Sequence, residues 1–97
     1  MKLRLSPRAV RNLGEIADYL RERSPAAARD VRAAILASLG HLTRYPEAGR
    51  RQSVPGIRKL VTRKYAYLIY YSIRAEADEI AVLSIRHPSQ QREHDDQ

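Results

Sequence analysis

The stretch that decides the fold is "GIRKLVTRKYAYLIYYSIR", residues 56–74. Its first half predicts a strand at Ile57 to Val61, and a longer apolar run predicts a second strand at Ala66 to Ile73. Because the second run is apolar on both faces, we expect that strand to lie at the centre of a sheet. The stretch also holds five basic residues and four tyrosines but no acid. The same strands can therefore present cations and aromatic rings to a partner.

Strand patterns continue on both sides of this stretch. The polar residues 76–79 predict a turn, and residues 80–85 predict a last strand that runs antiparallel to the one before it. Near the start of the chain, Leu3 and Leu5 alternate with basic residues, which predicts a short strand with one buried face.

Two amphipathic helices are predicted between the first strand and the rest of the sheet. Each begins at a Ser-Pro pair, Ser6-Pro7 and Ser24-Pro25, in which serine caps the helix and proline suits its first position. Apolar residues recur at helical spacing on one face of each helix: Val10, Leu13, Ile16, Ala17 and Leu20 in the first, and Ala28, Val31, Ile35, Leu39 and Leu42 in the second. The joint is only a few residues long, which is typical of an antiparallel helical hairpin.

The order of these elements predicts an α+β fold. We expect an N-terminal strand, an antiparallel helical hairpin and then a three-stranded antiparallel sheet, with the hairpin on one face of that sheet. Residues 1–97 form a single domain with a modest core. Residues 88–97 are polar and are expected to be a flexible tail.

Composition excludes several classes of function. The chain has no cysteine, which excludes disulfides, thiolate catalysis and cysteine-ligated metals. No apolar run resembles a signal peptide or a transmembrane helix, so we expect a cytoplasmic protein without a membrane partner. The formal net charge of +7 favours acidic partners. All eleven acids lie outside residues 48–75, whereas seven basic residues lie inside them.

Six segments, in this order along the chain, carry a family resemblance: "LSPRAVRNLGEIADYL", "SPAAARDV", "LTRYPEAGR", "PGIRKLV", "YAYLIYY" and "IAVLSIRH". The sequence resembles the ParE/RelE superfamily of toxins from bacterial toxin–antitoxin pairs, and the ParE branch most closely. The segments cover nearly all of residues 3–87. The resemblance implies a type II toxin with the helical hairpin and antiparallel sheet predicted above.

The resemblance implies one of two activities. RelE-like toxins cleave messenger RNA in the ribosome, whereas ParE-like toxins poison DNA gyrase and are not known as nucleases. An antitoxin encoded beside the toxin silences either kind. In the ParE type, the antitoxin joins a DNA-binding module to a C-terminal segment that wraps the toxin. We therefore expect a ParD-like antitoxin as partner, and contact with operator DNA only through it.

The residues favour the gyrase activity over RNA cleavage. A metal-free ribonuclease needs a base, an acid and clustered cations, and the candidates are His87, Arg86, Arg58 and Arg63. His87 follows the last strand, where RelE-like relatives often place a catalytic histidine or tyrosine. Tyr67 argues against cleavage, because cleaving relatives commonly have arginine there and the ParE branch commonly has tyrosine. No catalytic residue is therefore assigned, and a metal-independent endoribonuclease stays the alternative.

Two sets of binding residues are predicted. The target-binding candidates are the basic and aromatic residues of the central stretch and of the last strand's end: Arg58, Lys59, Arg63, Lys64, Tyr67, Arg86 and His87. The antitoxin-binding candidates lie on the helices and on the central strand: Leu13, Ile16, Leu20, Val31, Ile35 and Tyr71. No cofactor or metal is implied, because the glycines are scattered singly and the histidines are far apart in the sequence.

Several alternatives stay open. We expect Arg58 and Arg63 to line an open basic face of the sheet, but Arg58 also suits a loop anchor. The tyrosines at strand spacing also suit a sheet core, and a lone histidine such as His87 is more often structural. An inactive relative that only binds its antitoxin and co-represses the shared promoter fits the same residues. Outside the family, the charge fits a small basic nucleic-acid-binding module.

Overall fold

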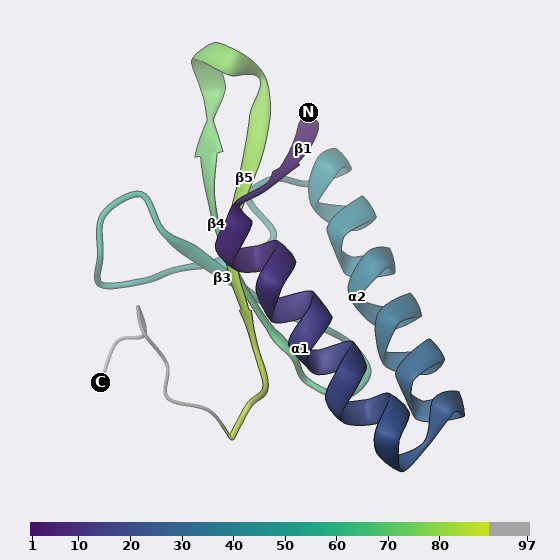
Figure 1. Ribbon diagram of the computed structural model, residues 1–97. Coiled ribbons are helices and arrows are strands. Elements are labelled where there is room, and N and C mark those ends of the chain that lie inside the picture. The colour runs from purple at the N-terminus through teal and green to yellow at the C-terminus, as the bar shows by residue number, and fades with distance from the viewer. Residues whose placement is uncertain (90–97) are drawn as a thin grey trace.

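The computed structural model describes residues 1–89, and these form two helices packed on a five-stranded sheet. The elements are β1 (Lys2–Leu5), α1 (Pro7–Arg23), α2 (Pro25–Arg44), β2 (Arg50–Arg51), β3 (Arg58–Val61), β4 (Leu68–Arg74), the 3-10 turn η1 (Ala75–Ala77) and β5 (Glu79–Arg86). Figure 1 shows both helices on the same side of the sheet. The α+β class and the helical hairpin are confirmed. The predicted tail lies, from residue 90 on, outside the described residues.

The sheet is larger than predicted, and it is mixed. Its strand order is β1-β5-β4-β3-β2. Strands β3, β4 and β5 are antiparallel neighbours, as expected. However, β1 joins the sheet in parallel with β5, and the two-residue β2 adds to the other edge beside β3. The parallel pair joins Leu3 to Ile80. A local sequence pattern cannot predict a pairing between residues so far apart in the chain.

Both helices begin where the Ser-Pro pairs predict. The Ser6 Oγ accepts a hydrogen bond from the backbone N–H of Ala9 at 3.0 Å, and the Ser24 Oγ accepts one from Ala27 at 3.2 Å. Each bond satisfies an amide that a helix start leaves without a partner. Ser6 also donates to the carbonyl oxygen of Leu83 in β5 at 2.8 Å. That second bond ties the start of α1 to the sheet.

The core lies between the sheet and the two helices. Strand β4 contributes Ile69 and Tyr71, which are fully buried, and β5 places Ile85 and Val82 opposite them. The second helix covers these residues with the predicted face, whose buried members are Val31, Ile35, Leu39 and Leu42. Burial of such side chains contributes roughly 1.5–3 kcal/mol each. This aliphatic and tyrosine core is what the absence of Phe and Trp requires.

The buried face of α1 is turned relative to the prediction. Val10 was expected in that face but is 54% exposed, whereas Ala9 is fully buried and Asn12 is 7% exposed. Consecutive helical residues point about 100° apart, so a face centred on Ala9 leaves Val10 outside. Leu13 and Ile16 are partly buried against the core, as predicted.

The turn between β3 and β4 is longer than the sequence pattern indicated. Tyr65 and Ala66 have positive φ angles of 68° and 53°, so β4 begins at Leu68 rather than at Ala66. The buried Thr62 closes this turn, because its Oγ1 accepts from the Tyr67 N–H at 3.0 Å and donates to the Lys64 carbonyl oxygen. Residues 65–66 therefore form a left-handed turn, although their composition is typical of a strand.

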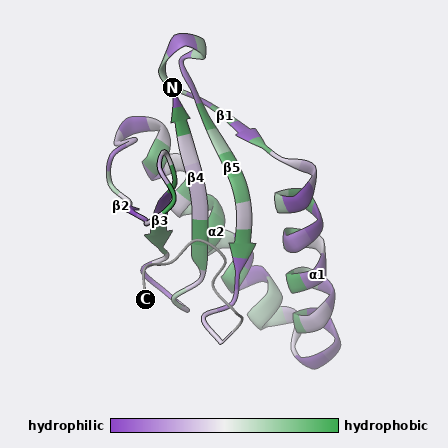
Figure 2. Cartoon of the chain, turned by 90° about the vertical axis from the view of Figure 1, so that its left-hand side faces the viewer, coloured by the Kyte–Doolittle hydropathy of each residue, from purple (hydrophilic) through white to green (hydrophobic). Residues whose placement is uncertain are grey.

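The opposite face of the sheet carries the alternate side chains of β3, β4 and β5. Because side chains alternate along a strand, Tyr70 and Leu68 lie on the face away from the core residue Ile69. The register pairs them with Lys59 and Arg86, respectively. Tyr70 and Leu68 are nevertheless 0% and 2% exposed. Figure 2 shows apolar residues concentrated along β4 and β5, and polar ones in the hairpin that joins them.

Candidate functional site

A pocket of about 400 Å³ lies between α1 and the end of β5. It is lined by one side of α1, by the residue that precedes β4, and by the residues at and after the end of β5: Asn12, Glu15, Ile16, Tyr19, Leu20, Tyr67, Ile85, His87 and Ser89. Two residues predicted as target-binding, Tyr67 and His87, therefore meet here. The lining contains one acid and no lysine or arginine.

Tyr67 and His87 form an edge-to-face aromatic pair in this pocket. Their ring centroids are 5.3 Å apart and the rings are nearly perpendicular, at 86°, which is a favourable arrangement for aromatic rings. The Tyr67 side chain is 5% exposed. Burial, and then the nearby Tyr19 hydroxyl, raise the pKa of Tyr67 above its ordinary value of 10.0. Tyr67 is therefore a neutral hydroxyl at physiological pH.

Two contacts with Ser89 fix the orientation of the His87 ring. The backbone N–H of Ser89 donates to the His87 Nδ1 at 3.1 Å, and the Ser89 Oγ lies 2.7 Å from the same nitrogen. A ring nitrogen that accepts a hydrogen bond carries no proton, so the contact with the Ser89 N–H places the proton of the neutral ring on Nε2. The two contacts hold the Nδ1 edge of the ring against Ser89.

Arg58 lies on the helix side of the sheet rather than on its open face. Its guanidinium donates to the carbonyl oxygens of Gly49 at 2.8 Å and Glu47 at 3.3 Å. The neighbouring Tyr71 hydroxyl donates to the Pro46 carbonyl oxygen at 2.7 Å and accepts from the Gly49 N–H at 2.9 Å. Arg58 therefore anchors the loop after α2, and the expectation that it lines an open basic face is wrong.

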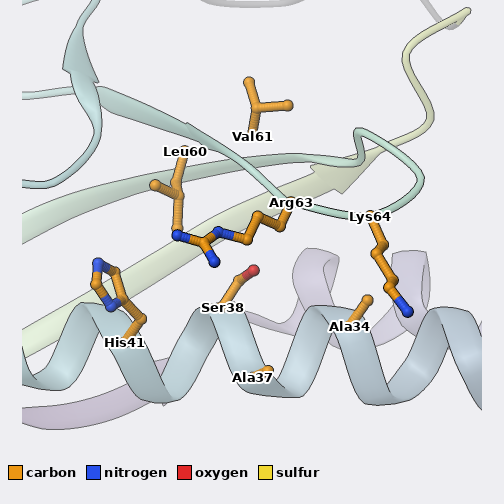
Figure 3. Close-up of a pocket in the computed structure, with 8 residues that line it drawn as sticks. All are labelled: Ala34, Ala37, Ser38, His41, Leu60, Val61, Arg63 and Lys64. Atoms are coloured by element: carbon orange, nitrogen blue, oxygen red, sulfur yellow. The ribbon is translucent and has the colours of Figure 1, made fainter.

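Arg63 and Lys64 lie on the turn after β3 and reach over α2. They line a groove of about 540 Å³ together with Leu60 and Val61 of β3 and with Ala34, Ala37, Ser38 and His41 of α2. Figure 3 shows the Arg63 guanidinium in the space between Leu60 and Ser38, and the Lys64 ammonium beside Ala34. Arg63 therefore also lies away from the open face of the sheet, contrary to expectation. Both residues are exposed.

The other two basic candidates remain on the open face. Lys59 pairs in register with Tyr70, and Arg86 pairs with Leu68. The seven target-binding candidates are thus divided among four places: the loop anchor, the α2 groove, the open face and the α1 pocket. The spacing of these residues in the sequence could not predict their separation, because it depends on the face of the folded sheet on which each strand residue lies.

The antitoxin-binding candidates differ in how much they are exposed. Val31, Ile35 and Tyr71 belong to the core and are at most 4% exposed. Leu13, Ile16 and Leu20 are only partly buried against that core, and the last two line the α1 pocket. The partly buried residues of α1 are therefore the members of this set that a partner can reach.

Three pocket residues were not singled out from the sequence. Asn12, Glu15 and Tyr19 lie on α1 at helical spacing, which places them along one side of the helix. Asn12 interrupts the apolar face of α1, and a buried asparagine usually has a specific hydrogen-bonding reason. Asn12 within the apolar face was therefore the sequence feature that could have indicated this part of the pocket.

Within residues 1–89, no cluster of three His, Cys, Asp or Glu side chains is arranged to hold a metal ion. None of the helices in that range is both long and apolar enough to cross a membrane.

Comparison with known proteins identifies the family. The model of the "ParE toxin of type II toxin-antitoxin system, parDE" matches residues 3–92. A curated protein of Sinorhizobium fredii named "Putative toxin Y4kP" is 33% identical over 90 residues, which cover 93% of this chain and 91% of that protein. The chain therefore belongs to the ParE toxin family and is a toxin of the type II toxin–antitoxin class.

Solved structures agree with this assignment. A chain of the chromosomal ParDE system from P. aeruginosa superimposes with a TM-score of 0.75 at 26% identity, covering 90% of this chain and 95% of that one. The E. coli RelBE complex gives a TM-score of 0.61 at 18% identity, with 92% and 98% covered. The second likeness establishes the shared fold alone. The predicted superfamily, with ParE as the nearer branch, is confirmed.

Proposed function

We propose that this toxin inhibits DNA gyrase and is neutralised by a ParD-like antitoxin. The observation that carries the proposal is the separation of the residues that a metal-free nuclease would have to gather. Arg58 is bonded to loop carbonyls, Arg63 lies over α2, and Arg86 lies on the open face of the sheet. A phosphorane intermediate needs several cations around one phosphate. These three arginines thus lie at three places: the loop after α2, the groove over α2 and the open face of the sheet.

The state of Tyr67 supports the same proposal. Its hydroxyl holds its proton near neutral pH because burial raises its pKa. General base catalysis requires a group that can take a proton near neutral pH. A protein target that is bound rather than cleaved makes no such demand.

The relatives also support a gyrase target over RNA, because the family model and the P. aeruginosa structure both carry ParDE names. The antitoxin is proposed to be ParD-like on the same grounds. It would contact the partly buried residues of α1, and operator DNA would meet the toxin only through it. Gyrase lies in the cytoplasm, so the toxin is proposed to act there.

A supercoiling assay tests the proposal. Purified toxin, separated from antitoxin, is incubated with gyrase, ATP and relaxed plasmid. We expect inhibited supercoiling or trapped cleaved DNA, and reversal when antitoxin is added. Full supercoiling would refute the gyrase target, provided the toxin is folded by circular dichroism and stops growth when expressed.

Two paired variants test the target surface. The double change Arg63→Gln and Lys64→Gln removes two exposed charges from the turn after β3. The double change Arg29→Gln and Arg32→Gln removes two exposed charges from α2 and is the matched control. We expect the Arg63/Lys64 variant to weaken inhibition roughly threefold to tenfold, because charges at the edge of an interface speed association. The Arg29/Arg32 variant should have little effect. Equal effects would instead indicate nonspecific attraction.

Ribosome-dependent RNA cleavage is the second candidate function, because His87 and Tyr67 do meet in one pocket. It is tested with programmed ribosomes and end-labelled messenger RNA. Cleavage that is abolished by His87→Ala, in a variant that keeps its fold, would support this candidate and count against the gyrase proposal.

A further inference from the structure

The pocket beside α1 is lined by three residues with a polar side-chain group that makes no hydrogen bond within residues 1–89. The Oδ1 of Asn12 accepts the Ile85 N–H at 3.0 Å, so its NH₂ group is turned the other way and donates to no other described residue. The Tyr67 hydroxyl and the Glu15 carboxylate likewise make no hydrogen bond or ion pair with described residues. All three line the same 400 Å³ space.

Two of these groups belong to side chains that are largely buried, and the third, Glu15, is exposed. Asn12 and Tyr67 are 7% and 5% exposed, so both are more than nine-tenths buried. Neither polar atom is completely closed off from solvent, and a bound molecule can therefore reach both from the pocket. Because both groups open into the pocket and are not used by the described residues, they are available to hydrogen-bond a ligand there.

The pattern of donors and acceptors defines what that ligand presents. Asn12 offers a donor, because its oxygen is already used by Ile85. Tyr67 offers a second donor, since its hydroxyl stays protonated, and Glu15 offers an acceptor. A ligand that matches them carries a carbonyl oxygen next to an N–H group. The walls formed by Ile16, Leu20 and Ile85 are apolar and suit an aliphatic stem.

Charge distinguishes between the chemical classes of ligand that carry a carbonyl oxygen next to an N–H group. A nucleotide brings a phosphate, but the pocket lining holds one carboxylate and no lysine or arginine. A partner's lysine or arginine would leave the Asn12 donor without an acceptor. A side-chain carboxamide is neutral, and it has one acceptor and two donors on a short stem.

We propose that this pocket receives a glutamine or asparagine side chain of a protein partner. The carboxamide oxygen accepts from the Asn12 amide and the Tyr67 hydroxyl, and its NH₂ donates to Glu15. The inference rests on the proposal that the toxin acts by binding proteins. The partner is the antitoxin, because Ile16 and Leu20, two of the partly buried α1 residues that it is proposed to contact, line this pocket.

The test uses small probes and no gyrase, so its outcome is independent of the supercoiling assay. Isotope-labelled toxin is titrated with N-acetyl-L-glutamine methylamide and followed by two-dimensional NMR. N-acetyl-L-methionine methylamide is the apolar control of similar length. We expect saturable shifts centred on Asn12, Ile16 and Ile85 with the glutamine probe at millimolar concentration, and shifts at least threefold weaker with the methionine probe.

Variants sharpen the assignment. Tyr67→Phe removes one hydroxyl and keeps the buried ring, and we expect it to weaken glutamine binding roughly threefold to tenfold, the equivalent of one lost hydrogen bond. Tyr65→Phe makes the same change at an exposed position outside the pocket and should leave binding unchanged. The proposal is overturned if the glutamine probe produces no saturable shift, if the methionine probe binds equally well, or if guanosine monophosphate binds the pocket more tightly.

Discussion

Tyr71 stabilises the loop after α2 through the two hydrogen bonds of its hydroxyl. That oxygen donates to the Pro46 carbonyl oxygen and accepts from the Gly49 N–H. The loop also fits tightly, because a Cβ added at Gly49 would lie 2.7 Å from the Tyr71 hydroxyl and 2.9 Å from the Lys59 carbonyl oxygen. Glycine is therefore required here by close approach.

We predict that Tyr71→Phe lowers the free energy of unfolding by about 1–3 kcal/mol, since it leaves a buried amide and a carbonyl without their partner. Urea denaturation measures this change. Tyr45→Phe is the matched control, because Tyr45 is 57% exposed, and it should change stability by less than about 0.5 kcal/mol. Equal effects of the two substitutions would show that the Tyr71 bonds are not stabilising.

Stability should also fall at high pH because of Tyr67 and Tyr71. Burial is the main cause that raises the pKa of both hydroxyls above 10.0. The folded protein therefore holds these two protons to a higher pH than the unfolded chain does. Their contribution to stability is fully present below about pH 10 and is lost as the pH rises through the folded pKa values.

Urea midpoints measured between pH 8 and pH 11 check this prediction. We expect a decline above pH 10 in the wild-type protein and a shallower decline in Tyr67→Phe, which cannot ionise at that position. Lysine deprotonation occurs in both proteins, so the difference between the two curves isolates Tyr67. Parallel curves would contradict a raised pKa for this hydroxyl.

At the scale of the element, the turn between β3 and β4 carries two residues in the left-handed region. Tyr65 and Ala66 have positive φ angles, which cost a side-chain-bearing residue roughly 1–2 kcal/mol each. The Thr62 hydroxyl and the two backbone hydrogen-bonding groups of Tyr67 hold this conformation closed. A glycine at position 66 would adopt the same angles without the cost.

We predict that Ala66→Gly raises the free energy of unfolding by up to about 1 kcal/mol, because relief in the turn outweighs the added freedom of the unfolded chain. Ala33→Gly is the matched control on an exposed helical residue, and it should be destabilising by about 1 kcal/mol. Thermal melting of both variants measures the difference. Destabilisation by Ala66→Gly would show that this turn is not strained.

The sequence predicted the elements whose signals are local. The Ser-Pro starts of both helices, the buried face of α2 and the central position of β4 all depend on residues a few positions apart. Features that depend on distant partners were not predictable in this way. The parallel pairing of Leu3 with Ile80 and the bond from Ile85 to Asn12 each join residues more than 70 positions apart.

The candidate site shows the same division. Sequence reasoning found Tyr67 and His87, but not that α1 completes their pocket with Asn12 and Glu15. It grouped Arg58 with Arg63 because both are basic and close in the chain. The fold separates them, since Arg58 points to the loop after α2 and Arg63 lies at a turn beyond the end of β3.

At the scale of the whole molecule, the chain has a small core and a formal net charge of +7. Its helices cover one face of the sheet (Figure 1), and the core contains neither Phe nor Trp. A core of this size leaves a domain of about 100 residues only marginally stable. A partner that binds only the folded toxin stabilises it by mass action.

We therefore predict that the cognate antitoxin raises the melting temperature of the toxin. At a free antitoxin concentration a hundred times the Kd, linkage adds about 2.7 kcal/mol, which corresponds to at least roughly 10 °C for a chain of this size. Differential scanning calorimetry of the toxin, with and without antitoxin, measures the shift. An antitoxin that lacks its C-terminal segment is the control and should produce no shift. If the toxin melts at the same temperature alone and in the complex, its fold does not depend on a partner, and the small core is sufficient by itself.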